Sequence, residues 1–473
     1  MKEPHIWNFA GQKVHMVGIG GSSMSGLAQM LLSQGFIVTG SDSQESYALD
    51  TLRDLGISVY AGHRPDEAAK ADLLVYSAAI SPKDPERVAA KEAKIPQMER
   101  AELLGQLMEG YEHRVCVCGT HGKTTLSSML SQILMDLEMN PTVHIGGSLD
   151  RIGGGTLVGG KNIFVVEACE FNRSFLHMPP SLAIITNIEE DHLDCYRDIE
   201  EIEEAFFEFI DKLPEDGLSI GLSDDERVMR VMHKSGRKFQ SFSLVGEADF
   251  TTENLRYDSK GCASFDALHC GELIGSVQLK VAGDFNALHA LGALAASLAL
   301  GCDAEKACSA LSRFEGVHRR FEHTGIVQGM HMYHDYGHNP AEMQSAVSVA
   351  CMQGRRVIAV MQPHTYSRVK GLFKSFLTCT KAADITLVTD IYAAREIDPG
   401  DVHSRLLVKG MSEHGLDAHL TPTFEDTEAW LLRNGKEGDL VLTMGCGNIN
   451  LLNDLMQAHW DDKQSKTEEL NGE

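Results

Sequence analysis

The sequence predicts an α/β protein of three domains in which strands and helices alternate. Three features lead to this prediction: a glycine-rich turn between a strand and a helix near residue 20, a second such turn near residue 120, and a new strand–helix series from about residue 323. A chain of 473 residues has room for roughly two to four domains. We expect Rossmann-like domains at both ends and a central P-loop ATPase-type domain with a parallel sheet.

The composition narrows the class of protein. The formal net charge is -25, which excludes a nucleic-acid binder that relies on a basic surface to release counterions. The 11 cysteines include no Cys-x-x-Cys pair, a pattern typical of reduced thiols in a cytosolic enzyme. No apolar run reaches membrane-spanning length, and residues 1–7 lack the apolar core of a signal peptide. We therefore expect a cytoplasmic protein without a membrane partner.

The first glycine-rich turn follows a strand over residues 13–20 and precedes a helix over residues 26–34. Gly20 and Gly21 lie in the turn, and Asp42 ends the next strand. This outline resembles a dinucleotide fingerprint, although Ser23 holds the place of its third glycine. Such a turn fits any nucleotide diphosphate nearly as well as NAD.

A further strand of this segment covers residues 73–80 and carries Ser77 near its end. Ligands of open α/β sheets gather at such strand ends, so Ser77 is a candidate for nucleotide binding. A new strand–helix series starts after residue 108. The first domain is therefore predicted to span residues 1–108.

The second glycine-rich turn has the features of a phosphate-binding loop. An apolar strand at residues 115–118 leads into it, and a helical pattern at residues 126–137 follows. Backbone amides at such a turn bind phosphate, Lys123 adds a charge for the outer phosphates, and Thr124 offers a hydroxyl to Mg²⁺. The loop is shorter than the common pattern, and a plain turn with a solvated lysine is the less favoured interpretation. The candidate ATP-binding residues here are Gly119, Thr120, Gly122, Lys123, Thr124 and Thr125.

Two further strand ends of the central segment carry candidate metal ligands. Glu167 ends the strand at residues 164–167, and His192 follows the strand at residues 182–188. With Thr124 they resemble an open Mg²⁺ shell. The acids around His192 also suit the N-terminus of a helix, and both interpretations can hold. Residues 240–282 are β-rich, and the central domain is predicted to span residues 109–316.

The last segment places polar clusters after several apolar strands, as expected of a substrate crevice. They cover residues 334–340, 362–368, 390–396 and 445–448. Just before them, paired arginines at residues 319–320 could contact triphosphate oxygens. This domain is predicted to span residues 317–460, with a polar tail at residues 461–473.

These motifs, in this order, resemble those of the bacterial Mur ligases over essentially the whole chain. The resemblance rests on residues 18–26, 119–125, Glu167, residues 187–194, 316–322, 335–340 and 362–368. It implies that ATP phosphorylates a carboxylate, and that an amine attacks the acyl phosphate to form an amide and release phosphate. The relatives that add later residues carry a carbamylated lysine where this chain has residues 206–209, Phe-Phe-Glu-Phe. This difference favours the alanine-adding branch, with UDP-N-acetylmuramate and L-alanine as substrates in peptidoglycan precursor synthesis.

The resemblance also implies roles for individual residues, with ATP and Mg²⁺ as cofactors. Those implied in catalysis are Lys123, His192, His338 and Arg368. Further ATP contacts are Asn286, Arg320 and Asp335, and the implied Mg²⁺ ligands are Thr124, Glu167 and His192. The implied UDP-sugar site contains Gly20, Gly21, Asp42 and Ser77.

The chain departs from the family pattern near each proposed site. The residues concerned are Ser23 in the first turn, Cys169 and Asn172 where the family has acids, Phe285 and His289 near the adenine position, and Thr365 where an arginine is expected. The change at Thr365 leaves the amino-acid specificity open.

Three alternatives follow from the same residues. A ligase that attaches a whole tripeptide to UDP-N-acetylmuramate shares the N-terminal and ATP motifs. A nicotinamide-dependent oxidoreductase fits the first turn but leaves Lys123, Thr124 and the metal-ligand candidates unexplained. A nucleotide-binding paralogue without ligase activity fits Cys169, Asn172 and Thr365.

Overall fold

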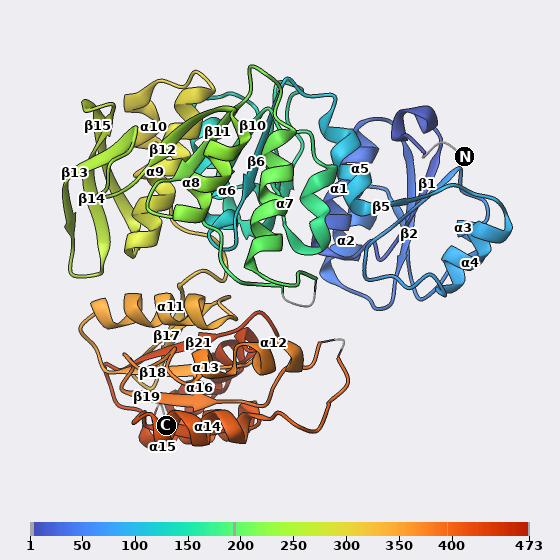
Figure 1. Ribbon diagram of the computed structural model, residues 1–473. Coiled ribbons are helices and arrows are strands. Elements are labelled where there is room, and N and C mark those ends of the chain that lie inside the picture. The colour runs from blue at the N-terminus through green and yellow to red at the C-terminus, as the bar shows by residue number, and fades with distance from the viewer. Residues whose placement is uncertain (1–3, 193–194, 395, 472–473) are drawn as a thin grey trace. The chain divides into compact units, whose positions relative to one another are not determined.

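The computed structural model describes residues 4–192, 195–394 and 396–471 (Figure 1). The chain forms two compact units. The first unit contains Met1–Asn254, Phe265–Val277 and Ala287–Phe314, and the second contains Leu255–Ser264, Gln278–Asn286 and Glu315–Glu473. Among the described residues, no helix is both long and apolar enough to cross a membrane.

The first unit begins with a five-stranded parallel sheet in the order β3-β2-β1-β4-β5. Its strands are β1 (Lys13–Val17), β2 (Ile37–Asp42), β3 (Ser58–Ala61), β4 (Leu73–Tyr76) and β5 (Gln97–Glu99). Its helices are η1 (Ile6–Phe9), α1 (Ser22–Ser33), α2 (Tyr47–Asp54), α3 (Pro65–Ala68), α4 (Pro85–Glu92) and α5 (Arg100–Met108). They lie on both sides of the sheet (Figure 1). The strand order changes direction between β1 and β4, where doubly wound sheets bind their ligands.

A ten-stranded sheet follows, in the order β15-β14-β13-β12-β11-β10-β6-β9-β7-β8. Its strands are β6 (His113–Cys118), β7 (Thr142–Leu149), β8 (Gly154–Leu157), β9 (Ile163–Glu167), β10 (Leu182–Ile185), β11 (Leu218–Leu222), β12 (Lys238–Phe242), β13 (Phe250–Tyr257), β14 (Cys262–His269) and β15 (Glu272–Ala282). β6 pairs in parallel with β9 on one side and β10 on the other. The loops that follow these three strands therefore meet at one edge.

The helical elements of this part of the chain include the long helix α6 that follows β6. They are α6 (Lys123–Asp136), η2 (Asp150–Ile152), η3 (Phe171–His177), α7 (Ile199–Asp211), α8 (Glu226–Ser235), α9 (Asp284–Ala299) and α10 (Ala304–Leu311). The apolar core of the first unit is continuous from β1 to α8, so both sheets share it. α5 contacts η3 so closely that a Cβ on Gly105 would lie 2.0 Å from the carbonyl oxygen of His177.

The second unit contains a six-stranded sheet in the order β16-β17-β21-β18-β19-β20. Its strands are β16 (Glu322–Val327), β17 (Met330–Asp335), β18 (Val357–Met361), β19 (Ile385–Val388), β20 (Ala418–Leu420) and β21 (Leu440–Met444). Only the β16–β17 pair is antiparallel among those described. The helices are α11 (Pro340–Met352), α12 (Tyr366–Gly371), α13 (Phe373–Phe376), α14 (Ser404–Glu413), α15 (Phe424–Asn434) and α16 (Asn450–Asn471). Two clusters of buried apolar side chains pack against this sheet.

The predicted α/β class with parallel-rich sheets is confirmed, while the boundaries at residues 108 and 316 stay predictions. No helix begins at Asp191 or His192, residues 193–194 lie outside the described residues, and the next helix, α7, is capped by the side chain of Asp198. α16 continues through the predicted polar tail as far as Asn471, in a stretch that contains neither glycine nor proline.

Candidate active site

The second glycine-rich turn joins β6 to α6 and requires glycine at two positions. Gly119 has φ +130 and Gly122, the N-cap of α6, has φ +81. A Cβ on Gly119 would lie 2.0 Å from Thr186 Oγ1, and one on Gly122 would lie 2.0 Å from His289 Nε2. Both the backbone conformation and the close neighbours therefore exclude larger residues. The loop presents the N-terminus of a 14-residue helix, where an anion is stabilised.

Lys123 is the first residue of α6, and its side chain folds back over the loop. Its Nζ donates to the carbonyl oxygens of Gly119 and Thr120 at 2.5 and 3.0 Å, and to both carboxylate oxygens of Glu170 at 3.0 and 3.2 Å. Burial alone would lower the pKa of Lys123, but the surrounding acidic groups, first the charge of Glu170 and then its hydrogen bond and the charge of Glu167, together outweigh burial and raise that pKa well above its ordinary value. The ammonium group therefore stays charged at any physiological pH.

Glu170 links Lys123 to His192, and the three residues form one cluster. The Glu170 side chain is only 3% exposed, and its Oε1 lies 3.8 Å from His192 Nε2. His192 adopts a left-handed conformation with φ +54, and its ring meets Phe171 edge-on at 5.1 Å between centroids. A buried carboxylate is thus held between two basic side chains, which offset part of the cost of burying its charge.

The proposed metal ligands Thr124 and Glu167 lie on neighbouring elements. Thr124 is buried in the first turn of α6, and Glu167 ends β9. Ser127, one turn further along α6, donates its hydroxyl to Glu167 Oε1 at 3.5 Å. The charge of Glu167 also contributes to the raised pKa of Lys123. The structure thus brings Glu167 to the same cluster as Lys123.

The two departures beside Glu170 have separate structural consequences. Burial raises the pKa of the Cys169 thiol to about 11, so this position carries no charge where the family has an acid. Asn172 has φ +51, within a kink that interrupts η3. Asparagine tolerates this left-handed conformation better than most residues.

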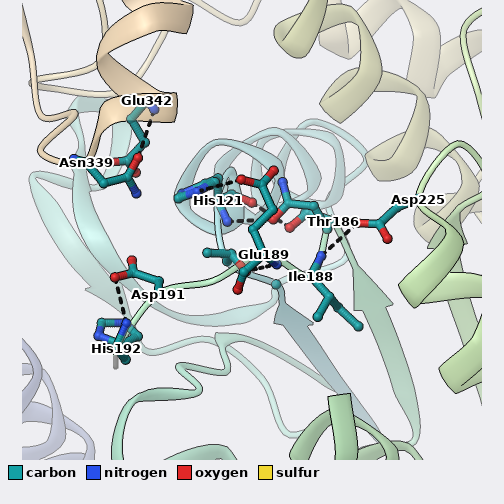
Figure 2. A network of polar contacts seen from close by, with 12 residues as sticks. His121, Thr186, Ile188, Glu189, Asp191, His192, Asp225, Asn339 and Glu342 are labelled. Atoms are coloured by element: carbon teal, nitrogen blue, oxygen red, sulfur yellow. Dashed lines mark hydrogen bonds and ion pairs between the residues drawn. The ribbon is translucent and has the colours of Figure 1, made fainter. Parts of the chain in front are cut away.

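The loop after β10 holds the phosphate loop in place (Figure 2). The backbone N–H of His121 donates to Asn187 Oδ1 at 2.8 Å, and Thr186 Oγ1 donates to the carbonyl oxygen of His121 at 2.5 Å. The Thr120 hydroxyl accepts from the N–H of Glu189 at 2.8 Å. Figure 2 also shows the His121–Glu189 ion pair and the bond from the Ile188 N–H to Asp225. Thr120 therefore fixes the conformation of the loop through its side chain.

The candidates for UDP-sugar binding gather at the switch point of the first sheet. The N–H of Gly20 donates to Asp42 Oδ2 at 2.9 Å, and the Asp42 Oδ1 accepts from the N–H of Ser43 at 2.7 Å. Gly21 is the N-cap of α1 with φ -63. The Ser77 hydroxyl would lie 3.6 Å from a Cβ on Gly18. Asp42 thus holds the turn after β1 in its conformation.

Asn286 and His289 lie on the first turns of α9. Asn286 is 6% exposed and donates its side-chain N–H to the carbonyl oxygen of Ala282 at 2.7 Å. His289 approaches Gly122 of the phosphate loop, as its distance to the would-be Cβ shows. The family departure at His289 therefore affects the loop itself.

In the second unit, Arg320 directly precedes Phe321, and Asp335 directly precedes Tyr336. Asp335 Oδ2 accepts from the N–H of Phe321 at 2.9 Å, and the guanidinium carbon of Arg320 lies 5.1 Å from the centre of the Tyr336 ring. Burial raises the pKa of Asp335, although Arg320 and two backbone N–H groups oppose this shift. The structure thus brings together two of the proposed ATP contacts.

A second cluster in this unit contains His338, His364 and Arg368. Arg368 Nη1 lies 3.0 Å from His364 Nδ1, and the His338 and His364 rings are 6.0 Å apart. Burial, followed by the charge of Arg368, lowers the pKa of His364 to about 4, so this ring is neutral near pH 7. Thr365 has φ +60 and is the N-cap residue of α12. The proposed amino-acid residues therefore share one cluster.

Sequence reasoning missed several residues of these clusters. Glu170 received no role, although it follows Glu167 within the same loop. Thr186 received no role, and Asn187 belonged to a motif without a role of its own; both bond to backbone groups of the phosphate loop. His364 lies within a polar cluster that was noted as a whole. Polar residues directly after an apolar strand were the available signal.

Comparison with known proteins defines the class. The description "Mur ligase family, catalytic domain" matches residues 13–112, "Mur ligase middle domain" matches residues 117–297, and "Mur ligase, glutamate ligase domain" matches residues 319–447. The chain belongs to the Mur ligase family, whose members are ATP-dependent ligases. The expected resemblance is confirmed.

Within the family, the chain is similar to UDP-N-acetylmuramate–L-alanine ligases. It is 43% identical to that of Acetivibrio thermocellus over 92% of this chain and 93% of the relative, and 40% identical to that of Clostridium beijerinckii over 93% and 96%. The crystal structure of UDP-N-acetylmuramate-alanine ligase from Thermotoga maritima matches with a TM-score of 0.81 and 26% identity, covering 96% of this chain and 100% of that one. A murein peptide ligase from Psychrobacter arcticus shares the fold, with a TM-score of 0.72 and 22% identity over 94% of this chain and 98% of that chain.

Proposed function

We propose that this chain joins L-alanine to the carboxylate of UDP-N-acetylmuramate in peptidoglycan precursor synthesis, with ATP converted to ADP and phosphate. The observation that carries this proposal is the cluster of Lys123, Glu170 and His192 at the phosphate loop. The relatives at 40–43% identity act on the same substrates, as their names state. ATP and nucleotide sugars are cytoplasmic metabolites, so we infer that the reaction takes place there.

Phosphoryl transfer needs positioning and neutralisation of charge more than a strong base. An oxygen of the substrate carboxylate attacks the γ-phosphorus of ATP, and ADP leaves. The amides of Gly122 and the α6 N-terminus bind phosphate oxygens, together with Gly119, Thr120 and Thr125 of the same loop. Lys123 stabilises the negative charge on the transferring phosphoryl group. To do so, its ammonium group gives up its hydrogen bonds to Glu170 and donates to a phosphate oxygen instead.

Mg²⁺ is the metal that this donor set suits. Thr124 offers a hydroxyl, Glu167 a carboxylate and His192 an imidazole, and the oxygen ligands are the kind that Mg²⁺ prefers. When bound, the ion would neutralise charge on the phosphate oxygens. The buried Glu170 between Lys123 and His192 supplies a further carboxylate beside this set.

The amide forms when the amino group of L-alanine attacks the acyl carbon and phosphate leaves. His338 and Arg368 are the proposed residues of the amino-acid site, and the neutral His364 orients Arg368 by accepting its hydrogen bond. Arg320, Asp335 and Asn286 are proposed to contact ATP. Gly20, Gly21, Asp42 and Ser77 are proposed to bind the UDP-sugar.

The test is phosphate release from ATP and Mg²⁺ with UDP-N-acetylmuramate and, in turn, L-alanine, glycine, L-serine or the tripeptide. Release that requires both UDP-N-acetylmuramate and L-alanine is expected. Preference for the tripeptide would identify a recycling ligase instead, and preference for glycine or serine would change the specificity alone. Tight ATP binding without release for any acceptor would contradict ligase activity.

A further inference from the structure

Arg100 is a cationic residue for which the motifs provide no role. It is the first residue of α5, directly after the edge strand β5, and its side chain is half-buried. Its Nη1 donates to the hydroxyl of Ser23 at 3.2 Å. Among the residues that the structure describes, Arg100 forms no ion pair. An arginine has five N–H donors, so most of its binding capacity is available.

The partner of Arg100 belongs to a chain of neutral polar groups. Ser23 Oγ lies 2.8 Å from His144 Nε2, and His144 Nδ1 lies 3.0 Å from Thr156 Oγ1. Burial, and next the charge of Arg100, lower the pKa of His144 to about 4, so the ring is uncharged near pH 7. Since Ser23 accepts from Arg100, its own proton points to His144 Nε2, and His144 Nδ1 donates to Thr156. This series of hydrogen bonds orients Arg100 without neutralising its charge.

The same hydrogen bonds connect the helix after the first glycine-rich turn to the ten-stranded sheet. Ser23 lies on α1, and His144 and Thr156 lie on β7 and β8, against which α1 packs. A Cβ on Gly26 would lie 2.1 Å from Thr156 Oγ1, so α1 and β8 are in direct contact. Arg100 is therefore fixed relative to both sheets of the first unit.

Helix α5, which begins at Arg100, also lies close to the cluster around Lys123. Glu170, which accepts from Lys123, directly precedes η3, and α5 contacts η3. Arg100 thus bonds to the first helical turn after the proposed UDP-sugar turn and begins a helix that contacts the element beside the proposed phosphoryl-transfer cluster.

We propose that Arg100 binds an anionic group of UDP-N-acetylmuramate, and that it positions the substrate between the first glycine-rich turn and the phosphate loop. The proposal rests on the proposed function and adds a residue to its substrate site. The substrate offers two such anions, its diphosphate and its carboxylate, and a guanidinium binds both through paired hydrogen bonds. Ser23, which replaces the glycine of the family pattern, supplies the support that orients the guanidinium.

The experiment measures binding of UDP-N-acetylmuramate and UDP-N-acetylglucosamine to the full chain by calorimetry, for wild type, Arg100→Met and Arg100→Lys. The second ligand has the diphosphate but lacks the carboxylate. Arg100→Met is expected to weaken binding of UDP-N-acetylmuramate about 10- to 100-fold, as for loss of a charged hydrogen bond. Arg100→Lys is expected to retain part of the affinity, because it keeps the positive charge but cannot form the paired hydrogen bonds of a guanidinium.

The comparison of ligands identifies the anion. Equal weakening of both ligands assigns Arg100 to the diphosphate, and weakening of UDP-N-acetylmuramate alone assigns it to the carboxylate. In steady-state kinetics the loss is expected in KM for the UDP-sugar, while KM for ATP stays unchanged. A merely structural role would instead lower the melting temperature and affect both ligands and ATP alike.

The matched control is Arg230→Met, which removes an exposed arginine of α8 that pairs with Glu203 of α7. It is expected to leave binding of both ligands unchanged. Unchanged affinity in Arg100→Met would overturn the proposal even if the wild type ligates normally. A wild type that binds neither UDP-sugar would instead overturn the proposed function, and the two failures are thus distinct. Should Arg100→Met fold poorly, unchanged affinity in Arg100→Lys and Arg100→Gln would overturn the proposal equally.

Discussion

The first unit contains two glycine-rich turns with the same layout of strand, turn and helix but different contents. At the turn after β1, Asp42 accepts from the N–H of Gly20, and the first helical turn carries Ser23. At the turn after β6, Lys123 opens the helix and is held by Glu170. An acidic side chain thus bonds to the backbone of the first turn, and a partly buried cation bonds to the backbone of the second.

The helix caps of the two turns differ as well. Gly21 has an ordinary φ of -63, and a Cβ there would meet its nearest neighbour at 3.4 Å. Gly122 has φ +81 and a neighbour at 2.0 Å. The first turn is therefore compatible with a side chain at the cap, and the second is not. The comparison shows that a similar glycine pattern conceals different steric demands.

The largest effect is expected from Lys123→Ala. Loss of the charge that stabilises the transferring phosphoryl group should lower kcat by about 10²- to 10³-fold or more. UDP-sugar binding at the first turn should remain nearly intact. Phosphate release and calorimetry with UDP-N-acetylglucosamine measure the two quantities, with Lys234→Ala, a surface lysine paired with Glu204, as control. Equal loss of both would show that the two turns do not act separately.

Gly122→Ala should have the next largest effect. The new Cβ would meet His289 in a backbone conformation that costs about 1–3 kcal/mol for a non-glycine residue, so ATP binding should be lost and the melting temperature lowered. Gly21→Ala, at the equivalent cap of α1, should retain both. Thermal unfolding with and without ATP checks this, and equal behaviour of the two variants would refute the steric difference.

A smaller effect concerns pH and arises at His144 of β7, which bonds to Ser23 in the first turn of α1. His144 has a pKa of about 4 in the folded chain, below its ordinary value of 6.5. The unfolded state therefore binds more protons between these values, and stability falls as pH drops from about 6.5 to about 4, by at most about 3 kcal/mol. His144→Gln should show a shallower decline of melting temperature over this range. Parallel curves for wild type and variant would contradict the assignment.

The smallest effect is expected from Asp42→Asn. The variant keeps the shape but weakens the charged hydrogen bond to Gly20, so UDP-sugar affinity should fall by about tenfold. ATP affinity should not change, because the second turn makes no use of Asp42. Titration with each nucleotide measures the two affinities. A loss of ATP affinity would contradict the prediction and show that the two turns are coupled.

The sequence allowed both turns to be predicted because each depends on a short pattern: an apolar strand, glycines and a helix. The strand ends that carry Glu167, His192 and Asp335 were placed for the same reason. The pairing of Glu170 with Lys123 could not be predicted, since it depends on the left-handed kink at Asn172 and on a strand order that local patterns do not specify.

Helix starts and several strand ends were predicted only to within a few residues. The strands expected at residues 13–20 and 73–80 end at Val17 and Tyr76. The helix expected from Gly26 begins at Ser22, because Gly21 can cap it and the serines of its first turn accept helical geometry. The series of hydrogen bonds from Arg100 through Ser23 to His144 was also missed. It joins residues that are 77 and 121 positions apart, and no single segment reveals such a contact.

The shared core of the first unit has a consequence for how the protein comes apart. Leu103, Leu104 and Leu107 of α5 belong to the same buried cluster as Phe175 of η3 and Phe206 of α7. A chain cut after Met108 would leave these leucines facing water, and such a fragment would tend to aggregate rather than fold as a stable module. We therefore expect the five-stranded sheet and the parallel strands of the ten-stranded sheet to unfold in a single cooperative event. Slow amide exchange in β1 and β6 should then be lost under the same conditions.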